Sequence, residues 1–158
     1  MTQPMTAESL VREHSRAVLS LCLAHTATIP DAEDAAQETF AKAIANLKSL
    51  RDTAKARSWL FGIARRTCVD QGRRRRQIQP LVGDVPAAVR ATDPRLEQLL
   101  AAMGRMAEDY REVITLYYLN GQSTDELAAN LGLTPQAARQ RLVRARLALH
   151  GLMREEQS

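Results

Sequence analysis

Arginines and glutamines recur along the stretch from Thr134 to Arg154, which holds five arginines and no acidic residue. Arginine can pair with guanine and glutamine with adenine, and cationic side chains also neutralise phosphates. At about 3.6 residues per turn, a helix would present these side chains on one face and its flanks. The set comprises Gln136, Arg139, Gln140, Arg141, Arg144 and Arg146. Their types and spacing predict a surface that reads double-stranded DNA.

Two helices joined by a tight turn would position this surface. Ser123 and Glu126 have capping-box spacing at the start of the first helix, and Gly132 stands where a left-handed residue ends it. Thr134 then caps the second helix, and Pro135 takes its first position. The inward stripe of the second helix is Ala138, Leu142, Ala145, Leu149 and Leu152. The pattern predicts a helix-turn-helix, and a helical hairpin with a solvated basic face is the simpler alternative.

The composition narrows the class of protein. The chain has 158 residues, is 45% hydrophobic, and carries a net charge of +4 from 22 basic and 18 acidic residues. A second basic run, Arg65 to Arg76, holds six arginines and one acid, so two separate patches favour a polyanionic partner. No stretch resembles a membrane span or a signal peptide, so we expect a cytoplasmic protein without direct membrane insertion.

Catalytic and metal-binding patterns are absent from the sequence. It contains no phosphate-cradling glycine loop, metal triad or nucleophile–base arrangement, so we expect no enzyme, no cofactor and no small-molecule substrate. Cys22 and Cys68 form no CxxC pair. His14, Cys22 and His25 share one stripe of a predicted helix, but no fourth ligand is apparent. A packed core is therefore the favoured interpretation, and we expect no metal site.

Three helices are predicted in the first half of the chain, at residues 6–25, 31–48 and 56–76, with a polar connection at residues 50–55. In the first helix, Leu19 and Leu23 lie opposite the main apolar stripe, which indicates a second contact surface. The residues expected to face inward on the third helix are Trp59, Leu60, Ile63, Ala64 and Thr67.

Charged residues distinguish the second and third predicted helices. Asp31, Asp34 and Glu38 cluster near the start of the second, where carboxylates interact favourably with the helix dipole. From composition alone, this acidic face is either simply solvated or a binding surface. On the third helix, Arg65, Arg66 and Arg73 are expected to face outward, which suits contact with a phosphate backbone.

A segment without helical periodicity divides the chain. Residues 77–92 contain two prolines and a glycine and are predicted to be a linker. Helix resumes at Asp93-Pro94, and a further helix is expected from Glu108 to Leu119 before the helix-turn-helix. We therefore predict an all-α fold of two small helical domains, 1–76 and 93–158, joined by the flexible linker at 77–92, with the helix-turn-helix in the second domain.

Both predicted domains resemble one family. DAEDAAQETF at Asp31 to Phe40 and RSWLFGIARRTCVDQGRRRR at Arg57 to Arg76 resemble the first conserved region of extracytoplasmic-function sigma factors. YREVITLYYLNGQSTDELAANLGLTPQAARQRLVRARLAL at Tyr110 to Leu149 resembles their second. The resemblance covers nearly all of the chain except the N-terminal tip and the linker.

The resemblance implies a factor that binds core RNA polymerase, directs it to promoter DNA and is controlled by an anti-sigma factor. The residues implied to contact polymerase are Asp31, Asp34, Gln37 and Glu38. Those implied to read the −35 element are Thr134, Gln136, Arg139, Gln140, Arg141 and Arg144. Those implied at the −10 element are Arg65, Arg66, Arg73 and Arg74, with the connection at residues 50–55.

The chain departs from the family pattern in places. Ala138 replaces a branched apolar residue on the inner face of the helix-turn-helix, and Gly62 and Gly72 replace larger side chains in the third helix. Two other classes of protein also fit parts of the sequence. One is a stand-alone dimeric regulator that binds operator DNA, which would leave the first domain without a purpose. The other is an interaction module that titrates another protein.

Overall fold

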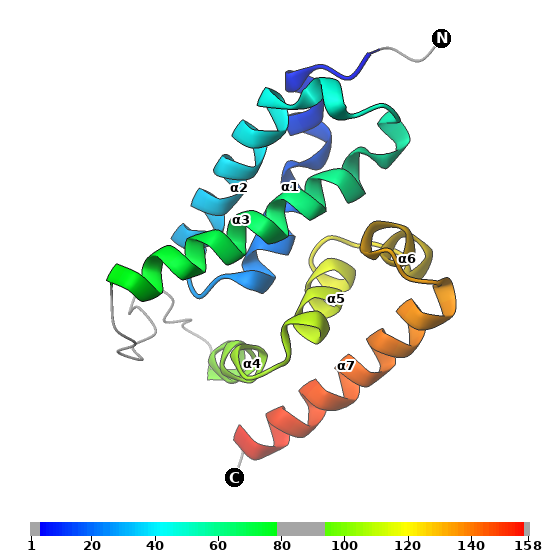
Figure 1. The fold of residues 1–158 in the computed structure, drawn as a ribbon. Helices are drawn as coiled ribbons and strands as arrows, with labels where there is room; N and C mark the ends of the chain where they lie inside the picture. The colour runs from blue at the N-terminus through cyan, green and yellow to red at the C-terminus, as the bar shows by residue number, and fades with distance from the viewer. Residues whose placement is uncertain (1–3, 79–93, 157–158) are drawn as a thin grey trace.

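The structure, a computed structural model, describes residues 4–78 and 94–156 and contains no strand within those ranges (Figure 1). The all-α fold class is confirmed. The expected linker at residues 77–92 lies outside the described residues except for its first two, which continue the third helix to Ile78. The described elements are α1 (Ala7–His25), α2 (Ile29–Ala45), the 3₁₀ turns η1 (Leu47–Ser49) and η2 (Thr53–Lys55), α3 (Ala56–Ile78), α4 (Pro94–Gly104), α5 (Glu108–Tyr118), α6 (Thr124–Leu131) and α7 (Pro135–Glu156).

Side-chain caps determine where the first two helices begin. The Thr6 hydroxyl accepts a hydrogen bond from the Ser9 N–H at 3.1 Å, and the Ser9 hydroxyl accepts one from the Thr6 N–H at 3.0 Å. Thr28 caps α2 by accepting from the Asp31 N–H at 3.2 Å. α2 therefore starts at Ile29, two residues before the predicted start, because the proline that follows Ile29 fits the first turn of a capped helix.

Helices α1, α2 and α3 pack against one another and form what we call the first lobe. Leu10 and Leu21 of α1 and Leu60 and Phe61 of α3 are completely buried in its core. α2 contributes mainly alanines, so its backbone can approach the other two helices closely. Large side chains from α1 and α3 therefore fill most of the space between the helices.

The buried side of α3 is wider than the sequence pattern predicted. Leu60, Ala64 and Thr67 are buried as expected. Phe61 and Cys68 are buried too, whereas Trp59 and Ile63 are half-buried at the edge. The reason is that α3 is covered by both α1 and α2. Two neighbouring helices bury a wider arc than a single apolar stripe suggests.

α1 is covered on two sides, because it packs against α2 and α3 and also contacts α5. Leu19 and Leu23, which were expected to form a second contact surface, are half-buried against one hydrophobic cluster. The same cluster includes Leu116 of α5 and Leu127 of α6. We call α4–α7 the second lobe. The apolar core is thus continuous between the two lobes.

Local capping signals form the helix-turn-helix as predicted. The Ser123 hydroxyl caps α6 by accepting from the Glu126 N–H at 3.1 Å. Gly132 then ends α6 with a φ of 68°, in the left-handed region that glycine adopts without strain. The Thr134 hydroxyl caps α7 by accepting from the Ala137 N–H at 3.1 Å. These contacts set the angle at which α7 leaves the turn.

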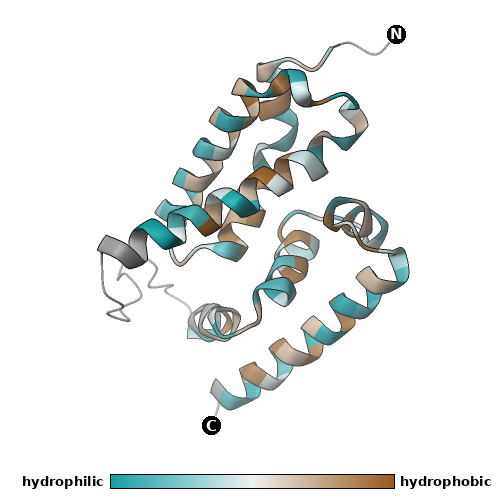
Figure 2. Cartoon of the chain, in the orientation of Figure 1, coloured by the Kyte–Doolittle hydropathy of each residue, from teal (hydrophilic) through white to brown (hydrophobic). Residues whose placement is uncertain are grey.

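α7 has one apolar side and one polar side, as the sequence pattern predicted. Ala138, Leu142 and Ala145 are buried, and Leu149 and Leu152 are partly buried. Figure 2 shows the alternation as successive hydrophilic and hydrophobic segments along the helix. The buried side packs against α4, α5 and α6, which leaves the opposite side to solvent.

We expect Phe61→Ala to lower the free energy of unfolding by about 3–5 kcal/mol, because it leaves a cavity in the core. Val69→Ala on the same helix is a suitable control, since Val69 is 53% exposed. Urea unfolding followed by circular dichroism measures both variants. Equal losses in the two variants would contradict the placement of Phe61 in the core.

Candidate nucleic-acid interface

The outer face of α7 carries the predicted base-reading side chains. Gln136, Arg139, Gln140 and Arg144 are exposed, and Arg141 is half-exposed at the edge. Within the described residues, no ion pair or side-chain hydrogen bond engages these four exposed side chains. Their polar atoms are therefore available to base edges and phosphates.

Arg146 differs from the other arginines of α7 because it folds back over α5. Its Nε donates a hydrogen bond to the Tyr118 hydroxyl at 2.8 Å, and its guanidinium carbon lies 5.1 Å from the centre of the Tyr117 ring. Tyr118 is 58% exposed, whereas Tyr117 is half-buried against the core. Together the two tyrosines form a platform that holds Arg146 and links α5 to α7.

Gln122 positions the helix-turn-helix and was missed in the sequence. It is 2% exposed, and its side-chain oxygen accepts from Asn130 Nδ2 at 3.2 Å. Its backbone N–H donates to the Leu116 carbonyl at 3.3 Å. The only sequence signal is a polar residue directly before the capping Ser123, where a hydrophobic residue is common. Gln122 thereby ties α6 to the end of α5.

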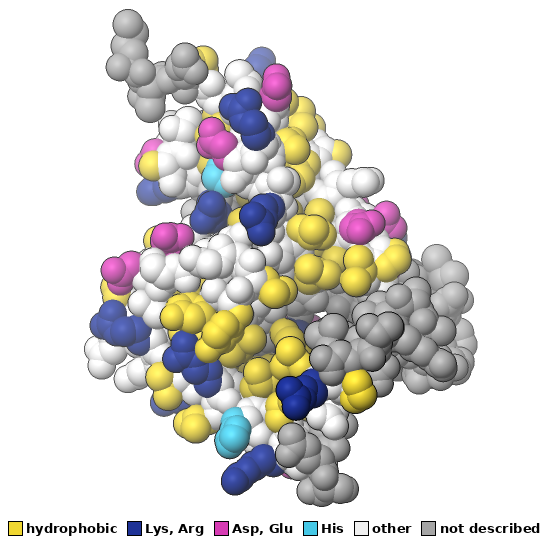
Figure 3. Space-filling view, turned by 180° about the vertical axis from the view of Figure 1, so that it is seen from behind, with side chains coloured by type: hydrophobic (Ala, Val, Ile, Leu, Met, Phe, Trp, Pro, Cys, Tyr) yellow, Lys and Arg dark blue, Asp and Glu magenta, His cyan; other side chains and the backbone are white. Residues whose placement is uncertain are grey.

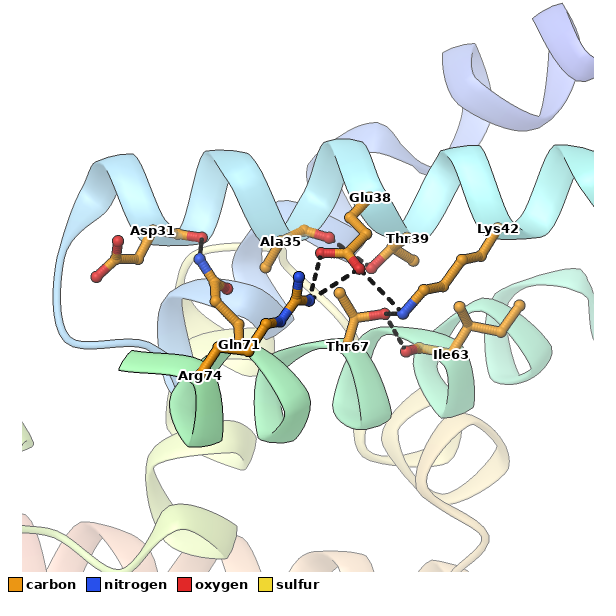
Figure 4. Close-up of polar contacts among 9 residues, drawn as sticks. All are labelled: Asp31, Ala35, Glu38, Thr39, Lys42, Ile63, Thr67, Gln71 and Arg74. Carbon is orange, nitrogen blue, oxygen red and sulfur yellow. Dashed lines mark hydrogen bonds and ion pairs between the residues drawn. The ribbon is translucent and has the colours of Figure 1, made fainter. Parts of the chain in front are cut away.

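The predicted acidic surface of α2 divides into exposed and buried residues. Asp34 and Gln37 are exposed, whereas Glu38 is half-buried and Asp31 is only 3% exposed. The Asp31 backbone carbonyl accepts from Gln71 Nε2 at 3.2 Å (Figure 4). The structure thus presents Asp34 and Gln37 to solvent and places Asp31 against α3.

Glu38 lies between two cations, one from α2 itself and one from α3. Its carboxylate is 3.3 Å from Lys42 Nζ and 3.1 Å from Arg74 Nη2 (Figure 4). Partial burial opposes ionisation, but Lys42 and Arg74 outweigh it and lower the pKa of Glu38. Lys42 also donates to the Thr67 hydroxyl at 3.2 Å. The predicted polymerase-contact and −10 residues therefore meet directly at Glu38 and Arg74.

The four predicted −10 arginines of α3 point in different directions. Arg66 and Arg73 are exposed and seven residues apart, which places them on one side of the helix. Arg74 turns toward Glu38 of α2. Arg65 is half-buried and turns toward the second lobe. The structure therefore brings together Arg66 and Arg73, but not all four.

Arg65 binds a buried glutamate that the sequence analysis missed. Glu112 of α5 accepts hydrogen bonds from Arg65 Nη2 and from Arg65 Nε, the latter at 3.3 Å. It also accepts one from His25 Nε2 at 2.5 Å. Burial raises the pKa of Glu112, but His25 and Arg65 outweigh that effect and lower it. The only sequence signal is a glutamate directly before the apolar pair Val113 and Ile114.

No three histidine, cysteine or acidic side chains gather within residues 4–78 and 94–156 as metal ligands would. Both cysteines, Cys22 and Cys68, are free and buried. In the same ranges, no helix has the length and hydropathy needed to cross a bilayer.

Two family models match the chain. Sigma-70 region 2 matches residues 10–78, which include the acidic face of α2 and the arginines of α3. Sigma-70 region 4 matches residues 96–149, which include the helix-turn-helix. The two matches follow one another in the chain and correspond to the two lobes.

Known sigma factors are similar along much of the chain. It is 32% identical over 159 residues to the ECF RNA polymerase sigma factor SigL of Mycobacterium tuberculosis, which covers 93% of this chain and 88% of SigL. It is 36% identical over 143 residues to the probable RNA polymerase sigma factor RfaY of Xanthomonas campestris pv. campestris. That match covers 82% of this chain, but the chain spans only 36% of the length of RfaY.

A solved structure shares the fold of both lobes. The complex of the sigma factor RpoE with the anti-sigma factor NepR from Bartonella quintana matches with a TM-score of 0.67 and 26% identity. The match covers 93% of this chain and 96% of the matched chain. With the two family models and the similarity to SigL, these findings show that the chain belongs to the extracytoplasmic-function (ECF) family of RNA polymerase sigma factors.

Proposed function

We propose that this chain binds core RNA polymerase and directs it to start transcription at specific promoters. This proposal rests on the exposed glutamine and arginine face of α7. The same chain also has the acidic face of α2 and the basic side of α3. Core polymerase supplied with the chain is expected to initiate at discrete sites on genomic DNA that core alone does not use. Tight operator binding by a dimer, with no effect on polymerase, would favour a stand-alone regulator instead.

In this proposal, α7 lies in the major groove of the −35 element. Gln136, Arg139, Gln140 and Arg144 face outward and have the donors and acceptors that distinguish base pairs there. Arg141, at the edge of this face, is proposed to contact a phosphate. Thr134 caps α7, so the helix N-terminus also favours the negatively charged backbone.

The exposed side of α3 is assigned to the −10 element. Arg66 and Arg73 supply a basic track for a melted strand, which needs charge along its backbone and room for an unstacked base. The connection at residues 50–55, which includes η2, adjoins the start of α3 and is the proposed base-reading segment. Arg65 and Arg74 contribute once they are released from their carboxylate partners.

Core polymerase is proposed to contact α2. Asp34 and Gln37 are exposed beside Glu38, and together they offer acidic and amide groups to a basic partner surface. Asp31 was included in this set from the sequence. Because it is 3% exposed, we assign it to the packing of α2 on α3.

An anti-sigma factor is proposed as the inhibitor. Hydrophobic side chains gather among cations on the face shown in Figure 3, and a protein partner could cover such a surface. Large hydrophobic residues that are exposed in the second lobe include Tyr118, Leu119, Val143 and Leu147. RpoE, with the similar structure, was solved bound to the anti-sigma factor NepR. We also propose that the chain acts in the cytoplasm and has no catalytic centre of its own.

Reversing the charge of Asp34 tests the polymerase surface. We expect Asp34→Lys to weaken binding to core polymerase about tenfold, because a cation replaces an exposed anion at the interface. Glu33→Lys is the matched control, since Glu33 is also exposed on α2 and has no assigned role. Equal weakening in both variants would indicate a general charge effect and would contradict the assignment.

Removing one base-reading side chain tests the α7 face. In the reconstituted holoenzyme, Arg144→Ala is expected to weaken binding to mapped promoters by about 1–3 kcal/mol and to relax selection at one position of the upstream element. Arg105→Ala removes the same charge from a residue paired with Glu155 at 2.9 Å, away from that face. Competition binding with single-base promoter variants measures both. Unchanged selection in Arg144→Ala would show that this arginine does not read a base.

A further inference from the structure

The two lobes share one buried ionic contact. Glu112 of the second lobe is 4% exposed, and its hydrogen-bond partners, His25 and Arg65, both belong to the first lobe. All the hydrogen bonds recorded for this carboxylate among the described residues therefore cross between lobes. Glu112 can make these hydrogen bonds only while the two lobes are in contact.

This contact is suited to reversible opening. In the closed arrangement, burial of the charged groups opposes their mutual attraction, and removal of one partner would leave the others buried without a counter-charge. When the lobes part, α1 and α3 leave together with His25 and Arg65. Glu112 then meets water and is not left buried without partners. The open state therefore avoids the large penalty of an uncompensated buried charge.

We propose that Glu112, His25 and Arg65 form an inter-lobe latch that holds the free sigma factor closed and inactive. One reason is competition for Arg65. This arginine lies on α3 among the residues assigned to the −10 element, yet its guanidinium donates to Glu112. It cannot bind this carboxylate and a DNA phosphate with the same donors at the same time. The inhibitory role rests on the proposed function, whereas the latch itself does not.

The second reason is distance. The −10 and −35 elements are about 25 base pairs apart, which is roughly 85 Å of duplex at about 3.4 Å per pair. A compact chain of 158 residues has a radius of gyration of only about 15 Å. Lobes in direct contact therefore cannot occupy both elements, and the latch must open before the promoter is bound at two points.

A weaker ion pair flanks the latch. Glu126 of α6, expected from the sequence to complete a capping box, lies 3.7 Å from Arg57 of α3. Both side chains are partly exposed, at 55% and 30%, so water screens their attraction. The buried contact of Glu112 therefore dominates the polar part of the interface.

The latch should respond to pH through His25. The charged and titratable groups around it are Glu108 and Glu112 on α5 and Arg65, Cys68 and Arg73 on α3. Burial opposes protonation, but Glu112, Cys68 and Glu108 outweigh it and raise the pKa of His25. A hollow of about 270 Å³ borders His25 and gives water access to the ring.

The sign of the pH effect follows from these shifts. Protonated His25 stabilises the closed form fully below the ordinary histidine pKa of about 6.5, and this contribution is lost as pH rises through the raised value. Ionised Glu112 stabilises the closed form above the ordinary glutamate pKa of about 4.3. This contribution is lost only as pH falls through the lowered pKa of Glu112. The latch is therefore strongest in mildly acidic solution and weakens in alkaline solution.

Small-angle X-ray scattering of the free full-length chain tests the latch. We expect a radius of gyration near 15 Å for the closed protein and above about 20 Å for Glu112→Gln, whose neutral amide cannot hold both cations. Asp109→Asn is the control, because it removes an exposed carboxylate from the same helix. Should Glu112→Gln fail to fold, the parent protein at pH 6 and pH 8.5 gives the same comparison. His25→Gln should abolish that pH difference.

Affinity for core polymerase tests the inhibitory role separately. Glu112→Gln is expected to bind core polymerase about tenfold more tightly, because less of the free protein is closed. Unchanged scattering in Glu112→Gln and across pH, or a parent protein that is already extended, would overturn the latch. Opening without tighter polymerase binding would overturn its inhibitory role. Failure of the parent protein to support initiation would instead refute the proposed function, and the scattering result would still decide the latch.

Discussion

The burial of α1 between two layers of helices is the constraint on which the arrangement of this chain depends. One side of α1 packs on α2 and α3, and the helix also contacts α5 of the second lobe. Because Leu19 and Leu23 pack into the same cluster as Leu116, hydrophobic burial draws the lobes together without selecting one register between them. Directional hydrogen bonds at Glu112 supply that selection. Hydrophobic burial thus holds the lobes together, and the hydrogen bonds of Glu112 determine how one lobe is placed on the other.

The charges of α3 show how the fold changes what a sequence pattern implies. Four arginines assigned to one DNA element are arranged around the helix, with Arg65 against Glu112 and Arg74 against Glu38. Of these four, only Arg66 and Arg73 have no carboxylate partner among the described residues. In the free protein, acidic residues neutralise part of the surface that would meet a nucleic acid. The electrostatic field of the first lobe is therefore weaker than its run of arginines suggests.

Local features were predictable from the sequence, and contacts between helices were not. The caps at Ser123 and Thr134, the left-handed Gly132 and the two sides of α7 depend on residues a few positions apart, and the structure contains all of them. Burial of Phe61 and the contact of Glu112 with Arg65 depend on which helices become neighbours in space. One helical period cannot encode that choice, because an apolar stripe specifies a buried side but no partner. Roles of individual site residues stay predictions for the same reason.

The distribution of aromatic residues gives the molecule a built-in optical reporter. Trp59, the single tryptophan, lies on α3 of the first lobe, whereas the three tyrosines, Tyr110, Tyr117 and Tyr118, all lie on α5 of the second. Energy passes from excited tyrosine to tryptophan with an efficiency that falls steeply as the rings move apart. Excitation of the tyrosines should therefore sensitise indole emission only while α3 and α5 are close. The unmodified chain carries its own donor and acceptor on opposite sides of the lobe boundary.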